Sequence, residues 1–245
     1  QKPDGWQQHH RYGSCINISL PTIDLRHRRR GMTVSHMPQP RISIITVARN
    51  AAATIGDCLS SVAAQDYGDL ELIVVDGAST DATVAIVRSF GKRVDRLLSE
   101  PDRGIGDAMN KGLALASGDY ILFLHADDYL IAPGAISRAV TAIGKSRGAD
   151  IQAFGLDFVT VCIPTRRLAR GFSWWMYYKS TILHQAVFCS RTIFDKVGIF
   201  DTELRVAMDY DFFLRAYRAG AVLQRHADVI AVMRDTGISS RKDAD

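Results

Sequence analysis

The sequence of 245 residues has few cysteines, no long apolar run and a small net charge of +4. Its four cysteines, Cys15, Cys58, Cys162 and Cys189, lie far apart and form no C-x-x-C pair. This excludes the common zinc and redox motifs and indicates reduced thiols in a cytoplasmic protein. No apolar run approaches the roughly 18 residues that a membrane-spanning helix needs. The first residues also lack the apolar core of a secretory signal.

Two common nucleotide-binding motifs are missing as well. No G-x-G-x-x-G follows the first predicted strand, which disfavours a dinucleotide-binding domain, and no Walker pattern occurs. The chain also lacks internal repeats. A hydrophobic content of 47% and a charged content of 23% are ordinary for a soluble globular protein. The length allows one α/β domain or two small ones with a sizeable core.

Residues 1–40 contain Gly, Pro, His and Arg without sustained periodicity, and we expect them to form a poorly ordered basic arm. His27 and Arg28 to Arg30 carry much of the positive charge. Such a run is typical of a solvated tail. The alternative is that this run contacts an anionic surface. We consider the inner face of the cytoplasmic membrane as that surface and do not expect nucleic acid as a partner.

Apolar strands alternate with amphipathic helices after Pro40. The predicted strands cover 42–50, 70–76, 94–98 and 120–124, and the predicted helices cover 51–65, 80–90, 104–116 and 133–146. This alternation predicts an α/β fold with a Rossmann-like, mostly parallel sheet flanked by helices. The second half is less regular, with strands expected over 151–161, 184–190 and 229–233, a short helix and turn over 192–201, and a helix over 208–218.

The segment 118–130 contains the most informative strand. Its apolar run, 120–124, ends at His125-Ala126-Asp127-Asp128. Two adjacent carboxylates at the end of a buried strand repel each other and lose hydration, so a divalent cation such as Mg²⁺ or Mn²⁺ is one interpretation. The other is a solvated loop in which Asp128 or its neighbour caps the helix that Pro133 opens.

Ligands of doubly wound sheets bind outside the carboxyl ends of the strands. Three polar clusters, 46–50, 76–81 and 125–128, are therefore expected at one edge. In the second cluster Gly77 permits an unusual backbone angle and Thr80 is a candidate helix cap. The charged segment 100–111 leads into a helix whose N-terminus can face an anion, although an exposed amphipathic helix has the same pattern.

The order of the motifs TVARN, VDGASTD, EPDRGIGDAMNKG, FLHADD, HQAVF and MDYDFFLR resembles the inverting family 2 glycosyltransferases of the GT-A fold. The resemblance covers about residues 41–240 and is strongest to bacterial enzymes of exopolysaccharide and lipopolysaccharide synthesis. It implies a donor half, 41–130, and an acceptor half, 131–240. It also implies transfer of a sugar from a UDP- or GDP-sugar to a hydroxyl of a glycan or lipid-linked acceptor, with Mn²⁺ or Mg²⁺ as cofactor.

The same resemblance implies which residues bind the donor and the metal. The donor-binding candidates are Thr46, Ala48, Arg49, Asp76, Ser79, Asp102, Arg103, Gly104, Asp107, Lys111 and Asp127. The metal candidates are Asp127, Asp128 and His125, where His125 departs from the D-x-D or N-x-D-D pattern that is usual in the family. Imidazole can nevertheless ligate Mn²⁺ or donate to a hydroxyl.

Asp209 matches the general base of the family, which takes the proton of the acceptor hydroxyl. Met208 stands where the family has glutamate, and the loss of that like charge should leave the base less basic. Asp211 is the reserve candidate, and an acidic helix N-terminus without a catalytic role is the alternative.

His184, Gln185, Trp174 and Trp175 are the acceptor-site candidates. The interpretations that compete with this are a buried structural histidine and ordinary aromatic core packing.

Two other functions remain open on the sequence. A nucleotidyltransferase that makes nucleotide sugars would need a Gly-rich basic loop after the first strand, and ARNAAAT does not provide one. A relative that binds sugar nucleotides without catalysis is favoured by Met208 and His125.

Overall fold

The computed structural model describes residues 39–146, 148–160 and 163–235. Apart from its last two residues, the predicted basic arm lies outside this range. The strands are β1 (Ile42–Ala48), β2 (Leu70–Asp76), β3 (Arg96–Ser99), β4 (Tyr120–Phe123), β5 (Tyr129–Leu130), β6 (Ile151–Thr160), β7 (Ile163–Arg167), β8 (Val187–Ser190) and β9 (Leu223–Arg234). The α-helices are α1 (Ile55–Ala63), α2 (Thr83–Ser89), α3 (Ile105–Leu115), α4 (Ala135–Lys145), α5 (Arg191–Val197) and α6 (Met208–Arg218), and the 3₁₀ helices are η1 (Gly91–Arg93), η2 (Trp174–Tyr177) and η3 (His184–Ala186).

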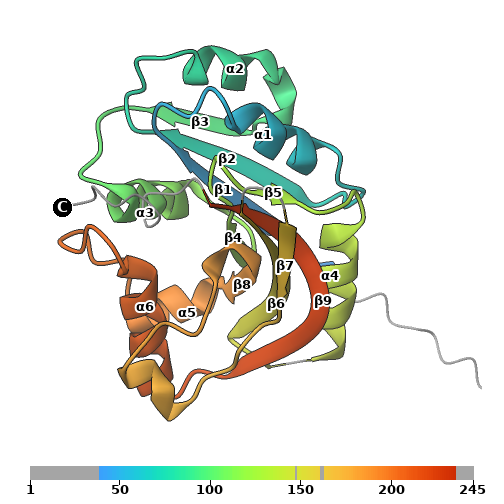
Figure 1. Cartoon of the computed structure of the whole chain (residues 1–245), viewed down its shortest axis with the longest axis vertical. Helices are drawn as coiled ribbons and strands as arrows, with labels where there is room; N and C mark the ends of the chain where they lie inside the picture. Colours follow the sequence, from blue (N-terminus) through green and yellow to red (C-terminus); the bar gives the residue numbers. More distant parts are fainter. Residues whose placement is uncertain (1–38, 147, 161–162, 236–245) are drawn as a thin grey trace, which may run out of the picture. The chain divides into compact units, whose positions relative to one another are not determined.

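The nine strands of the described ranges form one mixed sheet in the order β3-β2-β1-β4-β8-β6-β9-β5, with β7 paired to β6 (Figure 1). Strands β3, β2, β1 and β4 are mutually parallel, as the alternation of strands and helices predicts. The second half of the chain adds β8 antiparallel to both β4 and β6. The predicted α/β fold is confirmed, and its antiparallel strands come from the less regular half.

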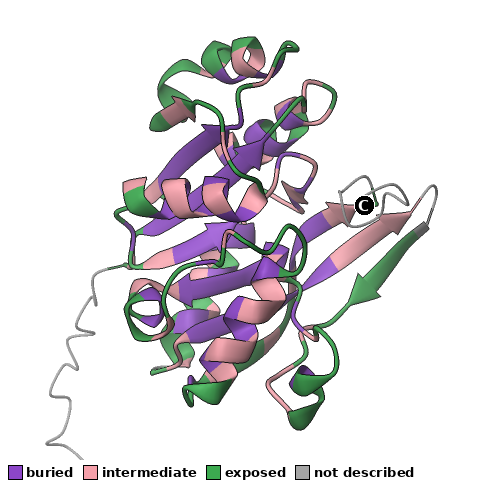
Figure 2. Ribbon diagram, turned by 90° about the vertical axis from the view of Figure 1, so that its left-hand side faces the viewer, coloured by how far each residue is buried: buried purple, intermediate pink, exposed green. Residues whose placement is uncertain are grey.

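Alternate side chains of each central strand enter different cores, because successive strand residues point to opposite faces. Ile44 of β1 and Leu122 of β4 pack on the face that α1 and α4 cover. Ile45 and Phe123 pack on the other face, against α3, α5 and α6. Figure 2 shows the central strands buried, with helices on either side whose outer surfaces are partly exposed. This two-sided burial explains why the central strands are almost continuously apolar.

Most predicted elements agree with the structure within a few residues, and the boundaries of β2 and α6 agree fully. Three features differ. Segment 184–190 begins as η3 before β8, segment 163–167 forms β7 although its charged residues predict no strand, and β9 starts six residues earlier than the predicted strand. No helix in the described ranges is both long and apolar enough to cross a bilayer.

Candidate active site

The carboxyl ends of β1, β2 and β3 lie level, because Ala48 pairs with Asp76 and Asp76 pairs with Ser99. Asp76 is fully buried. Its carboxylate accepts hydrogen bonds from the Ser79 backbone N–H (3.0 Å), the Ser79 hydroxyl and the Ser99 hydroxyl (2.7 Å). Asn50 donates its backbone N–H to the same Ser79 hydroxyl at 2.8 Å. Asp76 and Ser79 therefore shape the loop at this sheet edge.

Gly77 lies where three loops meet. A Cβ atom at this position would be 2.2 Å from Asp102 Oδ2 and 3.4 Å from Arg49 Cδ. The glycine is needed for this close approach rather than for its backbone angle, since the positive φ of the loop falls on Ala78 at 56°. Arg49 and Asp102, two predicted donor-binding residues from distant parts of the sequence, thus lie on either side of the same loop.

Gly77→Ala should weaken nucleotide binding while leaving the fold intact. The added methyl group would displace the Asp102 carboxylate, which is the flexible end of a side chain, so the cost to stability is small. We expect at least a roughly tenfold higher Kd for a bound nucleoside diphosphate, measured by calorimetry. Gly68→Ala is the matched control, because a Cβ there meets nothing within 4 Å. Equal affinity in both variants would contradict the placement of the donor site.

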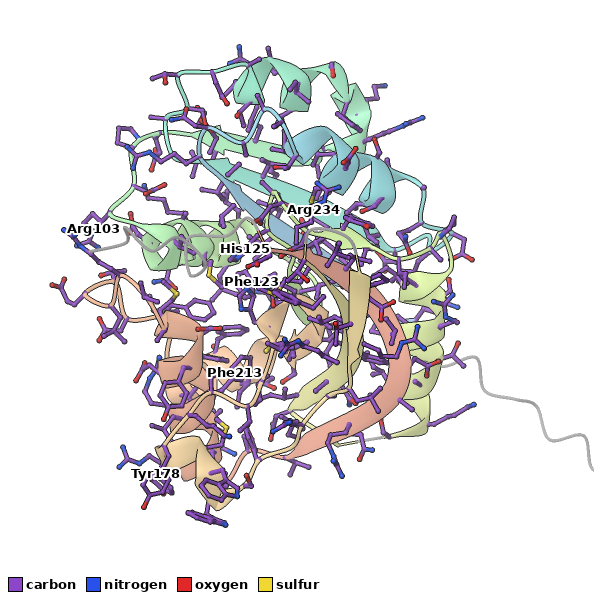
Figure 3. All side chains as sticks on the ribbon, in the orientation of Figure 1. Arg103, Phe123, His125, Tyr178, Phe213 and Arg234 are labelled. Atoms are coloured by element: carbon purple, nitrogen blue, oxygen red, sulfur yellow. The ribbon has the colours of Figure 1, made fainter. Side chains whose placement is uncertain are left out.

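The segment between β3 and α3 is held by a local charge network. Asp107 accepts the Arg103 backbone N–H at 3.1 Å, and its other oxygen lies 3.5 Å from the Arg103 guanidinium. Lys111 Nζ lies 2.8 Å from Glu100 Oε1 and also donates to the Pro101 carbonyl. The Arg103 side chain is 71% exposed and extends outward (Figure 3). Of this network, Arg103 is the cation best placed to reach a ligand.

The HADD turn follows β4 along the edge of β1. The Ala126 backbone N–H donates to the Val47 carbonyl, and Asp128 N–H donates to the His125 carbonyl at 3.0 Å. Asp128 is 2% exposed, and its Oδ1 accepts the Arg234 backbone N–H at 3.3 Å. The alternative interpretation, in which Asp128 or its neighbour caps the next helix, is wrong, since α4 begins after Gly134 without a side-chain cap. Burial and then the neighbouring Asp127 raise the pKa of Asp128 to about 7.

A hydrogen bond of 2.9 Å joins His184 Nδ1 to Asp209 Oδ2. His184 lies on η3, Asp209 lies in the first turn of α6, and the His125 ring is 4.7 Å from the His184 ring. Burial opposes the ionised form of Asp209, but the hydrogen bond and charge of His184 outweigh it and lower the pKa. Burial likewise opposes protonation of His184. The negative charges of Asp209, Asp128 and Asp127 outweigh this effect and raise the pKa of His184. The pair therefore favours a carboxylate on Asp209.

Three buried polar atoms beside this pair have no hydrogen-bond partner among the described residues: His125 Nε2, His184 Nε2 and Gln185 Oε1. Burial lowers the pKa of His125 to about 3, so its ring is neutral at physiological pH. Buried polar atoms are usually satisfied by protein, water or ligand. These three atoms thus mark a surface that suits a polar ligand such as a hydroxyl or phosphate.

Helix α3 and the segment before α6 are joined through a residue that was not among the predicted site residues. The Asn110 side-chain amide donates to the Phe200 carbonyl at 2.8 Å and accepts the Phe200 backbone N–H at 3.0 Å. Met208 packs close to Gly106 of α3 and is 6% exposed. This explains the apolar residue at position 208, because its side chain faces α3 rather than the His184–Asp209 pair. The polar position of Asn110 on a predicted helix does not indicate this partner, which lies 90 residues further along the chain.

Several predicted residues lie away from the cluster. Thr46 is fully buried and its hydroxyl faces Cys58 Sγ at 3.8 Å, so the expected side-chain contact with a donor needs correction. Asp211 accepts a hydrogen bond from Arg215 at 2.8 Å, so the reserve candidate pairs with its own helix rather than with His184. Trp174 and Trp175 are 56% and 50% exposed and stack on each other, so core packing is wrong for them.

The comparisons with known proteins identify the family of this chain. The family model described as "Glycosyl transferase family 2" matches residues 43–201, which contain the three strand-end clusters. The chain belongs to glycosyl transferase family 2. This glycosyltransferase is 35% identical over 200 residues to a "PGL/p-HBAD biosynthesis glycosyltransferase" of Mycobacterium bovis, covering 79% of this chain and 76% of that protein. It is 36% identical over 187 residues to an uncharacterized glycosyltransferase of Mycobacterium tuberculosis, covering 72% of this chain and 69% of that protein.

Solved structures show the same fold. S. aureus TarS superposes with a TM-score of 0.67 at 22% identity, over 79% of this chain and 36% of the TarS chain. This glycosyltransferase therefore spans only about a third of TarS. The mannosyltransferase PcManGT of Pyrobaculum calidifontis, solved with GDP-Man and Mn²⁺, superposes with a TM-score of 0.62 at 21% identity, over 79% of this chain and 56% of that one. The family assignment also removes nucleotidyl transfer as the leading alternative.

The residues of the HADD turn fit a divalent cation in part. Asp127 is partly exposed and offers hard carboxylate oxygens, which suit Mg²⁺ and Mn²⁺. However, no three His, Cys, Asp or Glu side chains of the described ranges are arranged to hold a metal together, so the predicted set of His125, Asp127 and Asp128 needs correction. A cation at Asp127 would take its other ligands from outside these side chains, as Mg²⁺ commonly does with phosphates and water.

Proposed function

We propose that this glycosyltransferase moves a sugar from a nucleotide-sugar donor to a hydroxyl of a glycan or lipid-linked acceptor, with inversion at the anomeric carbon. The observation that carries the proposal is the His184–Asp209 pair, an ionised carboxylate beside three unpartnered polar atoms and across from the HADD turn. The relatives support a donor of the UDP- or GDP-sugar type, since TarS was solved with UDP-GlcNAc and PcManGT with GDP-Man.

Asp209 serves as the general base in this scheme. The acceptor hydroxyl gives its proton to Asp209 while its oxygen attacks the anomeric carbon. The bond to the leaving phosphate breaks on the opposite face, and the nucleoside diphosphate departs with the electron pair. His184 holds Asp209 in the carboxylate form through its 2.9 Å hydrogen bond. In this proposal His184 and Gln185 contact the acceptor.

The charge of the leaving diphosphate needs stabilisation at the opposite side. Arg103 and the N-terminus of α3 supply positive potential there, together with Lys111. A divalent cation held by Asp127 would neutralise further phosphate charge when bound. Arg49, Asp102, Gly104 and Asp107 line the loops next to these groups and are proposed as further donor contacts, with the backbone of Ala48. On this scheme residues 41–130 bind the donor and residues 131–240 bind the acceptor.

Surface-polysaccharide or glycolipid synthesis at the cytoplasmic face of the membrane is the setting that we propose for this activity. The names of the mycobacterial relatives support a role in biosynthesis of a glycosylated product. Cys58 and Cys189 are free and buried, and burial raises the pKa of each thiol to about 12. Such unreactive reduced thiols suit a reducing compartment.

Binding of a nucleoside diphosphate should raise the thermal unfolding midpoint, and Asp127→Ala should remove most of the increase that depends on Mn²⁺. A ligand at 100 times its Kd stabilises the folded state by about 2.7 kcal/mol, which corresponds to a shift of several degrees. The measurement is a thermal-shift series with UDP and GDP, each with and without Mn²⁺. Asp195→Ala, an exposed carboxylate on α5, is the control. Equal Mn²⁺-dependent shifts in both variants would contradict the role of Asp127.

A further inference from the structure

A cluster of exposed aromatic and basic side chains lies at one end of the described structure. We name it the aromatic–basic face, and it comprises Arg170, Trp174, Trp175, Tyr177, Tyr178, Lys179, Arg218 and Arg225. Tyr178 is 73% exposed and Trp174 is 56% exposed. Figure 3 shows Tyr178 at the lower end of the structure and His125 near its middle. So many large aromatic side chains in solvent mark an interaction surface rather than a core.

The aromatic rings are fixed in their outward positions. Met176, in the middle of η2, is fully buried, and the Tyr210 hydroxyl donates to its backbone carbonyl at 2.6 Å. The rings of Trp174 and Trp175 stack with centroids 4.0 Å apart. Lys179 lies 5.7 Å from the centre of the Trp175 ring. The turn is thus anchored to α6 by one residue and presents its neighbours to solvent.

The charge of this face has one sign. Residues 158–194 contain no Asp or Glu, and neither do residues 212–227. An open pocket of about 640 Å³ beside η2 has Arg170, Lys179 and Arg225 in its wall, together with Phe172 and Tyr217. Arg218 lies 5.6 Å from the centre of the Tyr177 ring. The face therefore presents cations and amphipathic rings and no carboxylate from these two segments.

We propose that the aromatic–basic face docks the protein on an anionic lipid bilayer. Trp and Tyr are the side chains that settle at the headgroup level of a membrane, where the ring is apolar and its N–H or O–H stays hydrated. Lys and Arg near the surface are attracted to anionic headgroups. A second copy of this chain is disfavoured as the occupant, because two faces of the same positive sign repel each other. The basic pocket offers space for lipid phosphates between the rings.

Docking in this way sets the distance between the membrane and the proposed base. Helix α6 begins next to Asp209 and ends at Arg218 in the aromatic–basic face. With a rise of 1.5 Å per residue, its length is roughly 15 Å. An acceptor hydroxyl would lie at this height if a few sugar units, or an isoprenoid phosphate, separated it from the bilayer. This last step rests on the proposed function, whereas the docking itself does not.

Vesicle binding of the full chain tests the proposal without any donor or acceptor. Trp6→Phe is used as the background, so that tryptophan emission reports only Trp174 and Trp175. We expect binding and a blue shift of emission with vesicles of equal parts phosphatidylcholine and phosphatidylglycerol, and at least roughly tenfold weaker binding to phosphatidylcholine alone. Sodium chloride should weaken the binding, since the attraction is electrostatic at long range.

Four sets of substitutions separate this face from other basic regions. Trp174→Ala with Trp175→Ala, and separately Lys179→Glu with Arg218→Glu, should each reduce binding to the anionic vesicles at least roughly tenfold without lowering the unfolding midpoint, because all four side chains are exposed. Binding of these variants is measured by co-sedimentation with the vesicles, because the aromatic variant retains no tryptophan in the Trp6→Phe background. Lys92→Glu with Arg93→Glu on η1 is the control of equal charge change and should bind as the parent does. A triple variant with Arg28→Ala, Arg29→Ala and Arg30→Ala tests whether the basic run of residues 1–40 is responsible for vesicle binding instead.

Two results would overturn the proposal. One is undiminished vesicle binding by the aromatic and charge-reversal variants, and the other is a loss that occurs only when Arg28 to Arg30 are replaced. A concentration-dependent dimer that disappears in the aromatic variant, with no vesicle binding by the parent, would show that a second copy covers the face and would also refute lipid docking. Each variant is checked for donor binding by thermal shift, so a failure of docking is distinguished from a failure of the proposed transferase.

Discussion

Asp209→Asn is expected to reduce kcat by about 10² to 10⁴-fold, because the asparagine amide cannot accept the proton of the acceptor hydroxyl. The side chain keeps its size, and its carbonyl oxygen can still accept a hydrogen bond from His184. Donor affinity and the unfolding midpoint should therefore change little. The measurement is the rate of nucleoside diphosphate release in the presence and absence of acceptor, together with the Kd of the donor.

Asp211→Asn is the matched control for this substitution. Asp211 lies two residues further along α6 and pairs with Arg215 rather than with His184. We expect it to retain kcat within about twofold and to lose only the small stabilisation of one half-exposed helix ion pair. Full activity of Asp209→Asn, or equal losses in both variants, would reject Asp209 as the base.

His184→Gln separates a positioning role for His184 from a merely structural one. Without the imidazole, burial would raise the pKa of Asp209, because the hydrogen bond and charge that now lower it are gone. A base is active when deprotonated, so the acidic limb of the profile of kcat against pH should move to higher pH. A lower kcat with an unchanged acidic limb would assign His184 to packing alone.

The sequence predicts the strands and helices well where burial imposes a clear period. Within 70–76, residues 72–75 are apolar on both faces because helices cover both faces of the parallel strands, and this pattern favours a strand. Helix α6 is equally clear because its apolar residues recur at helical spacing around Phe212 and Phe213. The segment 163–167 was missed because β7 pairs only with β6 among the described strands, so residues 164–167 are exposed and two of them are arginines.

The candidate site could be predicted in its parts but not in its contacts. The expectation that polar clusters meet at one sheet edge follows from parallel topology and needs no distances. The pairing of His184 with Asp209 depends on how η3 and α6 pack across the second half, and no local pattern encodes that. The same holds for the Asn110 contact with Phe200 and for Arg234, whose backbone N–H reaches Asp128 from the end of β9.

Asp128→Asn should stabilise the fold. Burial and the neighbouring Asp127 raise the pKa of Asp128 from its ordinary value of 3.8 to about 7. Ionising this carboxylate therefore costs the folded state roughly 2–4 kcal/mol at alkaline pH, whereas a neutral asparagine does not incur that cost. We expect the free energy of unfolding of the variant to exceed that of the wild type by this amount at pH 8, measured by urea denaturation in the presence of EDTA.

The pH dependence of this difference follows from the order of the two pKa values. Below pH 3.8 the carboxyl is protonated in both the folded and the unfolded state, so it adds no penalty to the wild type. The penalty grows as the unfolded chain ionises, and it is complete above about pH 7, where the folded carboxyl has ionised too. The stability advantage of Asp128→Asn should thus rise between pH 4 and 7, while Asp195→Asn on the exposed face of α5 should show no such rise. A difference that stays constant across this range would mean that burial and Asp127 do not raise the pKa of Asp128 in the folded protein.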